Sequence, residues 1–575
     1  MGNFRYSGDT FYLNNEVFRV LSGTVQYFRI HPAQWRDRLL KLKACGLNTV
    51  ETYSCWNLHE AVEGNFDFTG GLDLGAYLDL AAELGLYVIF RPGPYICAEW
   101  DMGGLPSWLL TYPGIKLRCS HPVFLEKVRN YLDKIFEIVR PRLISNGGNI
   151  IMMQIENEYG AYGDDKAYLN QLKDMYTQAG IDCVLFTCDW PYYCMMNGGK
   201  IPGVMSAGNF GSNPKQACDF IKKFAPDQPF FDAELWEGWF DSWFDKEHHT
   251  RDAQETADVV AELLDLGGNF NIYIFSGGTN FGFHNGANCL PDKYLPTVTS
   301  YDFDGVITEA GDLTPKYYAL KKVLEERFGP APDIPVANSE KRAYRSVPFT
   351  EYSSLWENLP EGRFSSWPLS MEEMGQDFGY LVYETEVDGP LEELPMYVYD
   401  FKDRAIVYVN GELRGISENM MERKDEMSLC LAPGETAQIR ILIENMGRVN
   451  FGDKLMDSKG LHGGLHIADR SVFGWKHYSL PMKDISQLQF SEEERRTVPG
   501  FLRAEFHVDR AADTFLRLPG LTKGVAFVNG FHIGRYWHGC RLYVPAPLLH
   551  PGENELVVFE SDSIDQSAAA EFKEE

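Results

Sequence analysis

The chain has 575 residues, 44% of them hydrophobic and 23% charged, which predicts a globular protein of about two to four domains. Its 82 acidic residues outnumber its 53 lysines and arginines and give a net charge of −29. This balance argues against a nucleic-acid partner and against an anionic membrane surface, because lysine and arginine bind both.

The N-terminus and the cysteines indicate the cellular compartment of the protein. The first fifteen residues contain no apolar core of a signal peptide, and no run reaches the about 18 apolar residues of a transmembrane helix. The eleven cysteines follow no framework spacing, and most lie inside apolar segments, as reduced thiols do. These features predict a cytoplasmic protein, although prior removal of a signal peptide would leave the same sequence.

Short apolar runs alternate with amphipathic helical patterns from the N-terminus to residue 328. We predict helices at 31–46, 72–85 and 121–141, and strands at 20–28, 49–56, 87–95, 150–158, 183–190, 203–210, 229–236 and 271–281. Continuous apolar runs are typical of strands that are covered on both faces. The alternation predicts a (β/α)8 TIM barrel over residues 1–328. An open doubly wound sheet is less favoured, because no glycine-rich phosphate loop follows the first strand.

The pattern changes after residue 328. The proline-rich stretch at 329–341 indicates a linker, and the rest of 329–377 is assigned only as a candidate extra strand of the last domain. Beyond it, short strands with alternating apolar residues dominate, and Asn-Gly pairs at 410–411 and 529–530 predict β-hairpins. We therefore predict two all-β sandwich domains, at 378–487 and 488–575.

Several of the predicted barrel strands end in carboxylates, which matters because catalytic groups of such barrels lie at the C-terminal strand ends. Glu99 follows the third strand, Glu158 ends the fourth and Glu234 ends the seventh. Paired carboxylates among aromatic rings suit glycoside hydrolysis, in which one group protonates the leaving oxygen and the other attacks carbon or activates water. The sequence shows neither a nucleophile elbow nor metal-ligand spacing, so no metal and no cofactor are predicted.

Neighbouring residues leave alternatives open. Glu156 and Glu158 would face the same side of an ideal strand, so sequence geometry alone does not decide which is the acid. Glu156 could instead anchor a neighbouring loop. We interpret Glu237 and Asp241 as rim residues, and the tryptophans at 236, 239 and 243 as a cleft wall rather than core.

Seven segments carry a resemblance to a known family. They are LSGTVQYFRIHPAQW, ETYSCWNLHE, RPGPYICAEWDMGGLPSWLL, QIENEYGAYG, AELWEGWFDSW, FSGGTNFGFHNGAN and TSYDFDGVITEAGDLTPKY. In this order they resemble glycoside hydrolase family 35, the retaining β-galactosidases, across the whole barrel. The resemblance implies jelly-roll, galactose-binding-like domains behind the barrel and a reaction that needs no metal or cofactor.

The resemblance also implies roles for single residues. Glu158 matches the acid/base, Glu234 matches the nucleophile, and Asn157 matches a contact to the sugar 2-hydroxyl. Further matches to substrate contacts are Tyr53, Cys97, Ala98, Glu99, Tyr273 and Tyr301, and Trp236 and Trp239 are predicted to wall the cleft. One departure is Phe303, because the family often has tyrosine there.

These matches predict an exo-acting retaining β-galactosidase. It would hydrolyse terminal non-reducing β-D-galactose from oligosaccharides by double displacement, with a β-1,3 linkage to an N-acetylhexosamine as the candidate bond. Two alternatives stay open: an exo-β-glucosaminidase of the same family, in which Glu99 would recognise an amine, and a catalytically dead sugar-binding protein. A homodimer through the β domains is left open as well.

Overall fold

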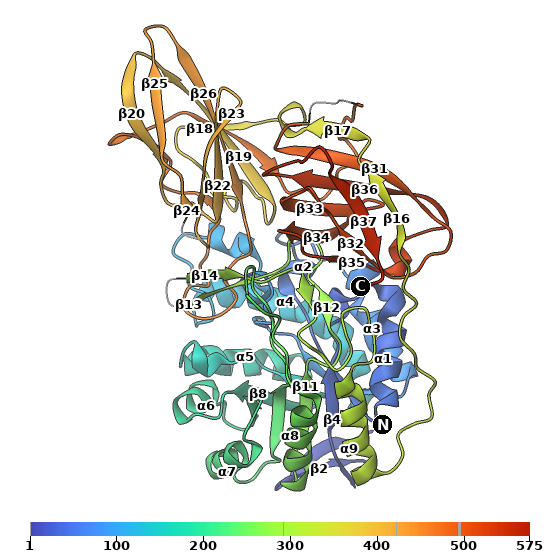
Figure 1. The fold of residues 1–575 in the computed structure, drawn as a ribbon. Helices are drawn as coiled ribbons and strands as arrows, with labels where there is room; N and C mark the ends of the chain where they lie inside the picture. Colours follow the sequence, from blue (N-terminus) through green and yellow to red (C-terminus); the bar gives the residue numbers. More distant parts are fainter. Residues whose placement is uncertain (1, 291–292, 421–422, 493–495) are drawn as a thin grey trace.

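A computed structural model describes residues 2–290, 293–420, 423–492 and 496–575 of the protein (Figure 1). Its N-terminal part is a barrel surrounded by helices, and its C-terminal part consists of antiparallel sheets stacked on one end of that barrel (Figure 1). Among the helices of these ranges, none combines the length and apolarity that a bilayer crossing demands.

Eight parallel strands close the barrel in chain order, as predicted. They are β4 (Leu21–Thr24), β5 (Thr49–Tyr53), β6 (Tyr87–Arg91), β7 (Ile150–Gln154), β8 (Val184–Asp189), β9 (Met205–Phe210), β10 (Phe231–Trp236) and β11 (Asn269–Tyr273). Each overlaps a predicted strand, which confirms the (β/α)8 architecture. Several predicted strands extended too far at their C-terminal ends, because there the chain leaves the ladder to form the loops of the barrel mouth.

Helices cover the outside of the barrel (Figure 1). They are α1 (Trp35–Ala44), α2 (Trp56–His59), α3 (Leu74–Glu83), α4 (Pro122–Val139), α5 (Lys166–Gln178), α6 (Tyr193–Gly199), α7 (Pro214–Phe224), α8 (Ala253–Asp265) and α9 (Pro315–Phe328). The three predicted helices are confirmed as α1, α3 and α4. Local signals explain their starts: Asp73 accepts a hydrogen bond from the Ala76 amide before α3, and Pro122 begins α4.

A three-stranded meander covers the N-terminal side of the barrel. It comprises β1 (Phe4–Ser7), β2 (Thr10–Leu13) and β3 (Glu16–Phe18). Phe4 and Phe11 share an apolar cluster with Phe186 and Phe231, which lie on barrel strands. Since this end is filled by apolar side chains, a site for a polar ligand has to lie at the other end.

Two sandwiches follow the barrel, each made of two antiparallel sheets. The first contains β18 (Arg363–Ser365), β19 (Tyr380–Asp388), β20 (Leu391–Val398), β22 (Arg404–Val409), β23 (Glu412–Glu418), β24 (Arg423–Lys424), β25 (Met427–Leu431), β26 (Thr436–Glu444), β28 (Leu465–Ile467), β29 (Arg470–Ser471) and β30 (Trp475–Leu480). The second contains β16 (Tyr344–Pro348), β17 (Glu351–Ser354), β31 (Gly500–Val508), β32 (Thr514–Arg517), β33 (Lys523–Val528), β34 (Phe531–Trp537), β35 (Leu542–Val544), β36 (Gly552–Glu560) and β37 (Ala569–Lys573).

The two Asn-Gly pairs form tight turns, as predicted. Asn410 and Gly411 join β22 to β23 with φ of 52° and 82°, and Asn529 and Gly530 join β33 to β34 with φ of 50° and 78°. Both central residues of a type I′ turn need positive φ, which asparagine and glycine tolerate best.

The stretch at 342–377 supplies strands to both sandwiches. Strands β16 and β17 pair with β37 and β31 of the second sandwich, whereas β18 pairs with β30 of the first. The preceding linker runs along the outside of the barrel from α9 to β16 (Figure 1).

Buried contacts join the sandwiches to the barrel. The backbone N–H of Arg448, from the first sandwich, donates to Oδ1 of Asp101 on the barrel at 2.6 Å, and its guanidinium lies 3.2 Å from Oδ2. Between the sandwiches, Nζ of Lys523 lies 2.6 Å from Oε1 of Glu444. These contacts bring a loop of the first sandwich to the barrel mouth.

Candidate active site

A cavity of about 200 Å³ lies at the C-terminal end of the barrel. We call it the pocket. Its lining consists of Tyr53, Ile96, Cys97, Ala98, Glu99, Glu158, Trp190, Glu234, Trp236, Trp239, Phe240, Tyr273, Asn288, Leu290, Phe303 and Phe451. Both carboxylates that the sequence singled out are therefore together, and of the other predicted site residues only Asn157 and Tyr301 are absent from the lining.

Glu234 lies near the C-terminal end of β10 and is held by three donors. Its Oε1 accepts hydrogen bonds from the Tyr53 hydroxyl at 2.8 Å and from Nη2 of Arg91 at 2.6 Å. Its Oε2 accepts one from Nε1 of Trp236 at 3.2 Å. The three contacts fix the orientation of this carboxylate.

Arg91 connects Glu234 to the residue before the other carboxylate. Its Nη2 donates to Oδ1 of Asn157 at 2.5 Å, and its guanidinium lies over the Tyr53 ring at 4.2 Å. Asn157 also accepts from Nε2 of Gln154 at 2.9 Å. Asn157 therefore lies behind the pocket surface, in a buried network with Arg91.

Glu158 lies beyond the end of β7 in a left-handed turn, with φ of 46°. Its Oε1 accepts from Nε1 of Trp190 at 2.7 Å and from Nδ2 of Asn209 at 3.0 Å. Within the described ranges its Oε2 accepts no hydrogen bond. Burial, and secondly the charge of Glu234, raise the pKa of Glu158 to about 7, against the opposing effect of its two donors.

Glu156 has a different environment although it is only two residues away. Its carboxylate pairs with the guanidinium of Arg118 through two hydrogen bonds, at 3.0 and 2.8 Å, and accepts from the Tyr168 hydroxyl at 3.0 Å. The assumption that Glu156 and Glu158 share one strand was wrong, because β7 ends at Gln154 and both glutamates have positive φ. Glu156 anchors the loop that carries Arg118.

Three consecutive residues of the pocket, Cys97, Ala98 and Glu99, have left-handed backbones with φ of 56°, 55° and 47°. Such conformations cost on the order of 1 kcal/mol or more each and occur mainly at functional sites. Glu99 Oε2 accepts from the Tyr301 hydroxyl at 2.5 Å, and Tyr301 in turn contacts the Tyr273 hydroxyl at 2.8 Å. Tyr301 therefore supports the pocket from behind. Burial raises the pKa of Glu99 to about 7.

Aromatic rings form one wall of the pocket. Trp236 packs edge-on against Trp190 and Trp239, with centroids 5.9 and 5.8 Å apart. The ring of Phe451, from the first sandwich, lies parallel to Trp190 at 6.3 Å. Trp236 and Trp239 are thus in the wall, whereas the prediction for Trp243 was wrong, because that ring is buried beside the second sandwich.

The two predicted rim residues, Glu237 and Asp241, have different environments. Glu237 is not a rim residue: it is fully buried, with Oε2 at 2.9 Å from Nζ of Lys316. Asp241 does lie at the surface, where its carboxylate contacts His248 at 2.5 Å and His249 at 2.8 Å. The sequence did not reveal the burial of Glu237 because its partner, Lys316, is distant in the chain.

Asp241, Asp245 and His249 lie close enough together to be candidate metal ligands, a cluster that the sequence spacing did not reveal. Protein donors already occupy the two carboxylates. Asp241 accepts from both neighbouring histidines, and Asp245 accepts from the Ser242 amide at 2.7 Å. This arrangement is explained without an ion.

Sequence reasoning missed several residues of the site, among them Arg91, Trp190, Asn209 and Phe451. The first three end β6, follow β8 and lie near the end of β9, so the strand-end rule could have found them. Phe451 belongs to the first sandwich, and no local pattern indicates that it reaches the barrel.

Comparisons with known proteins agree with this architecture. The model of "Glycosyl hydrolases family 35" matches residues 10–327, and models of the first all-beta domain and the galactose-binding domain of beta-galactosidase match 368–481 and 499–554. The chain is 39% identical over 542 residues to a beta-galactosidase of Xanthomonas manihotis, covering 93% of this chain and 90% of that protein. It is 41% identical over 580 residues to beta-galactosidase-1-like protein 2 of Homo sapiens (96% and 88% covered) and 37% identical over 594 residues to a beta-galactosidase of Bos taurus (96% and 90%).

Proposed function

The chain belongs to glycosyl hydrolases family 35, and we propose that it hydrolyses terminal non-reducing β-D-galactose from oligosaccharides with retention of configuration. The observation that supports this most directly is the pair Glu158 and Glu234 in one small pocket. Its volume of about 200 Å³ is below the roughly 300–1,000 Å³ of sites for drug-sized ligands. A single sugar ring is therefore the expected occupant, which suits an exo-acting enzyme.

In the first step Glu234 attacks the anomeric carbon while Glu158 donates its proton to the glycosidic oxygen. The bond from carbon to that oxygen breaks, and an ester between galactose and Glu234 forms. In the second step Glu158 takes a proton from water, the water oxygen attacks the anomeric carbon, and Glu234 leaves. Two inversions preserve the β configuration, and the expected separation of the two carboxyl groups is about 5–5.5 Å.

The environments of the two carboxyls support this division of roles. Glu158 has an elevated pKa of about 7 and an Oε2 without a donor in the described ranges, so it can hold a proton that faces the pocket near neutral pH. Glu234 is held by Tyr53, Arg91 and Trp236, which suits a nucleophile that has to keep one orientation.

We further propose that Glu99 and Tyr273 bind galactose hydroxyls, that the backbone of Cys97 and Ala98 shapes the same side, and that Trp236 and Trp239 contact the sugar faces. All of these residues line the pocket. Asn157 lies behind the surface of the pocket. It can contact the sugar 2-hydroxyl only if the sugar ring reaches the bottom of the pocket. Phe303 gives the pocket an apolar edge where a tyrosine would offer a hydroxyl.

Hydrolysis of nitrophenyl β-D-galactoside, beside the β-glucosaminide, tests the proposal. The wild type should release nitrophenol from the galactoside, and Glu234→Gln should lower kcat on the order of 10⁴-fold. Glu137→Gln, an exposed substitution on α4, is the matched control. Turnover of the glucosaminide alone would contradict galactose as the proposed substrate. No turnover of either compound would favour the sugar-binding alternative.

Azide rescue tests the assignment of roles. In Glu158→Gly, azide should attack the galactosyl ester and give β-galactosyl azide, because the nucleophile still acts from the opposite face. An α-galactosyl azide from this variant would contradict the proposed roles of Glu158 and Glu234.

For the linkage, we propose that the enzyme prefers galactose bonded β-1,3 to N-acetylglucosamine. Faster hydrolysis of the β-1,4 isomer would contradict this preference.

We also propose the cytoplasm as the site of action. All eleven cysteines are free thiols, and six of those in the barrel are buried. Such a distribution suits a reducing compartment. Fractionation of the native cells, with activity measured in each fraction, tests this assignment.

A further inference from the structure

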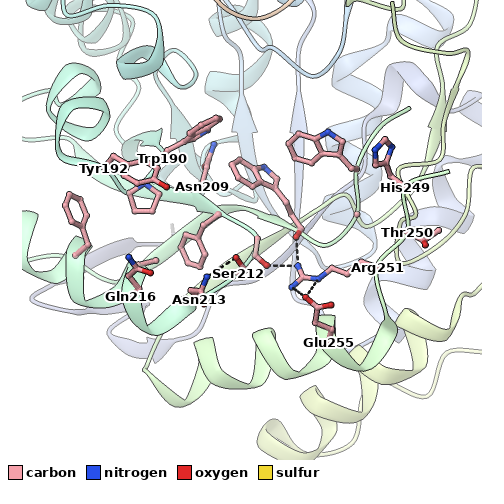
Figure 2. Close-up of a pocket in the computed structure, with 18 of the residues that line it drawn as sticks. Trp190, Tyr192, Asn209, Ser212, Asn213, Gln216, His249, Thr250, Arg251 and Glu255 are labelled. Carbon is pink, nitrogen blue, oxygen red and sulfur yellow. Dashed lines mark hydrogen bonds and ion pairs between the residues drawn. The ribbon is translucent and has the colours of Figure 1, made fainter. Parts of the chain in front are cut away.

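A second cavity, of about 790 Å³, adjoins the pocket and is shown in Figure 2. We call it the groove. It shares Trp190, Trp236 and Trp239 with the pocket, so these tryptophans border both spaces. Further out the groove continues into a hollow of about 620 Å³ over α7 and α8, with which it shares Asn213 and Gln216. The three spaces form one track that leads away from the barrel mouth.

The groove begins at the carboxyl that we assign as the acid. Trp190 and Asn209 line the groove, and both donate a hydrogen bond to Oε1 of Glu158. A general acid lies beside the leaving-group oxygen of the bond that is broken. The sugars that follow the terminal galactose therefore start next to Glu158 and can continue into the groove.

Exposed aromatic side chains lie along the groove. Tyr192 and Tyr193 are 60% and 69% exposed, and Trp239 is 40% exposed. Singly exposed aromatic residues, such as Tyr318, are ordinary, whereas these three line one cavity. Tyrosine and tryptophan have an apolar face and a polar edge, which fits the apolar face and the hydroxyl rim of a sugar ring.

The polar groups of the groove indicate an uncharged ligand. The side chains of Tyr192, Tyr193, Gln216 and Thr250 make no hydrogen bond within the described part of the chain, and they are exposed. Arg251 is already neutralised: its guanidinium lies 2.8 Å from Oε1 of Glu255 and also donates to backbone carbonyls. His249, which also lines the groove, pairs with Asp241 at 2.8 Å. The hydroxyl and amide side chains named above match the hydroxyls of neutral sugars (Figure 2).

We propose that the groove is a distal subsite for the second and later sugars of a neutral oligosaccharide, so that the preferred substrate is longer than a disaccharide. This inference rests on the proposed function, because it takes the pocket as the place of the terminal galactose. Tyr192 and Tyr193 would stack on distal rings, and Gln216 would bind their hydroxyls.

The test compares two substrates with the same scissile bond. One is the disaccharide galactosyl-β-1,3-N-acetylglucosamine, and the other is the neutral tetrasaccharide that carries it on lactose. In the double variant Tyr192→Ala/Tyr193→Ala, the ratio of kcat/KM for tetrasaccharide over disaccharide should fall about tenfold, a loss within the range for one buried aromatic side chain. Tyr318→Ala on α9 is the matched control, since Tyr318 is also 60% exposed but lies outside the groove.

Calorimetry with the Glu234→Gln variant measures sugar binding to the groove independently of turnover. The tetrasaccharide should bind about tenfold more tightly than the disaccharide, and the two tyrosine substitutions in this background should remove the difference. Equal affinities for the two sugars, or a difference that persists without the tyrosines, would overturn the inference. If the wild type hydrolysed neither sugar, the proposed function would fail, and the binding data would still decide the role of the groove.

Discussion

The pocket and the groove share a wall of tryptophans but differ in how their side chains are held. In the pocket Glu234 has three hydrogen-bond donors and Glu158 has two. In the groove the side chains of Tyr192 and Gln216 have none within the described ranges. The difference fits two tasks, because bond cleavage needs reacting groups in fixed positions, whereas binding the rest of a sugar chain tolerates adjustment.

The largest expected effect concerns proton donation in the pocket. Glu158→Gln should lower kcat on the disaccharide about 10²- to 10⁴-fold, the range for a general acid–base group. The wild-type kcat/KM should fall as pH rises through about 7, because the acid must be protonated and its pKa lies there. A pH profile of the wild type that stays flat from pH 6 to pH 9 would contradict the role of Glu158.

A second effect separates the two neighbouring glutamates. Glu156→Gln should lower the free energy of unfolding by about 3–5 kcal/mol, because Arg118 would remain buried with its charge uncompensated. Glu158→Gln is the matched control and should not destabilise the protein at pH 8. The pKa of Glu158 is about 7 in the folded protein and about 4.5 in the unfolded chain, so the free energy of unfolding falls as pH rises from about 4.5 to 7. Glutamine does not ionise, so the Glu158→Gln variant avoids this loss. Thermal unfolding at pH 5 and pH 8 measures both variants; equal losses would contradict the distinction.

A smaller effect is expected from one hydrogen-bond donor to Glu234, the proposed nucleophile. Tyr53→Phe removes the hydroxyl that donates to Glu234 and should lower kcat/KM about 10- to 100-fold, since a hydrogen bond to a charged group contributes about 1.5–3 kcal/mol. Steady-state kinetics on the nitrophenyl galactoside measure it, with Tyr318→Phe as the control. An unchanged kcat/KM would show that Arg91 and Trp236 suffice to hold Glu234.

The smallest effect concerns the shared wall. Trp239→Ala should lower kcat/KM for both the disaccharide and the tetrasaccharide, by about tenfold each, because this ring borders both spaces and is only partly covered. The ratio between the two substrates should change less than in the tyrosine double variant. A change confined to the tetrasaccharide would place Trp239 in the groove alone.

Much of the barrel could be predicted because its signals are local. Continuous apolar runs gave all eight strands, and the residue types at the ends of the fourth and seventh strands indicated paired carboxylates. The environments of Glu156 and Glu158 could not be predicted in this way. Two left-handed residues after Gln154 separate their side chains, and the partners Arg118 and Trp190 are distant in sequence.

The sequence by itself determined the class of fold, the hairpin turns and the pair Glu158 and Glu234, since periodicity and motif order depend on neighbouring residues. Only the tertiary structure decided that Phe451 reaches the pocket, that Trp243 does not, and that an aromatic groove begins beside Glu158. The physical reason is that these features come from packing between elements far apart in the chain, where a single residue of register or one loop path changes which side chains meet.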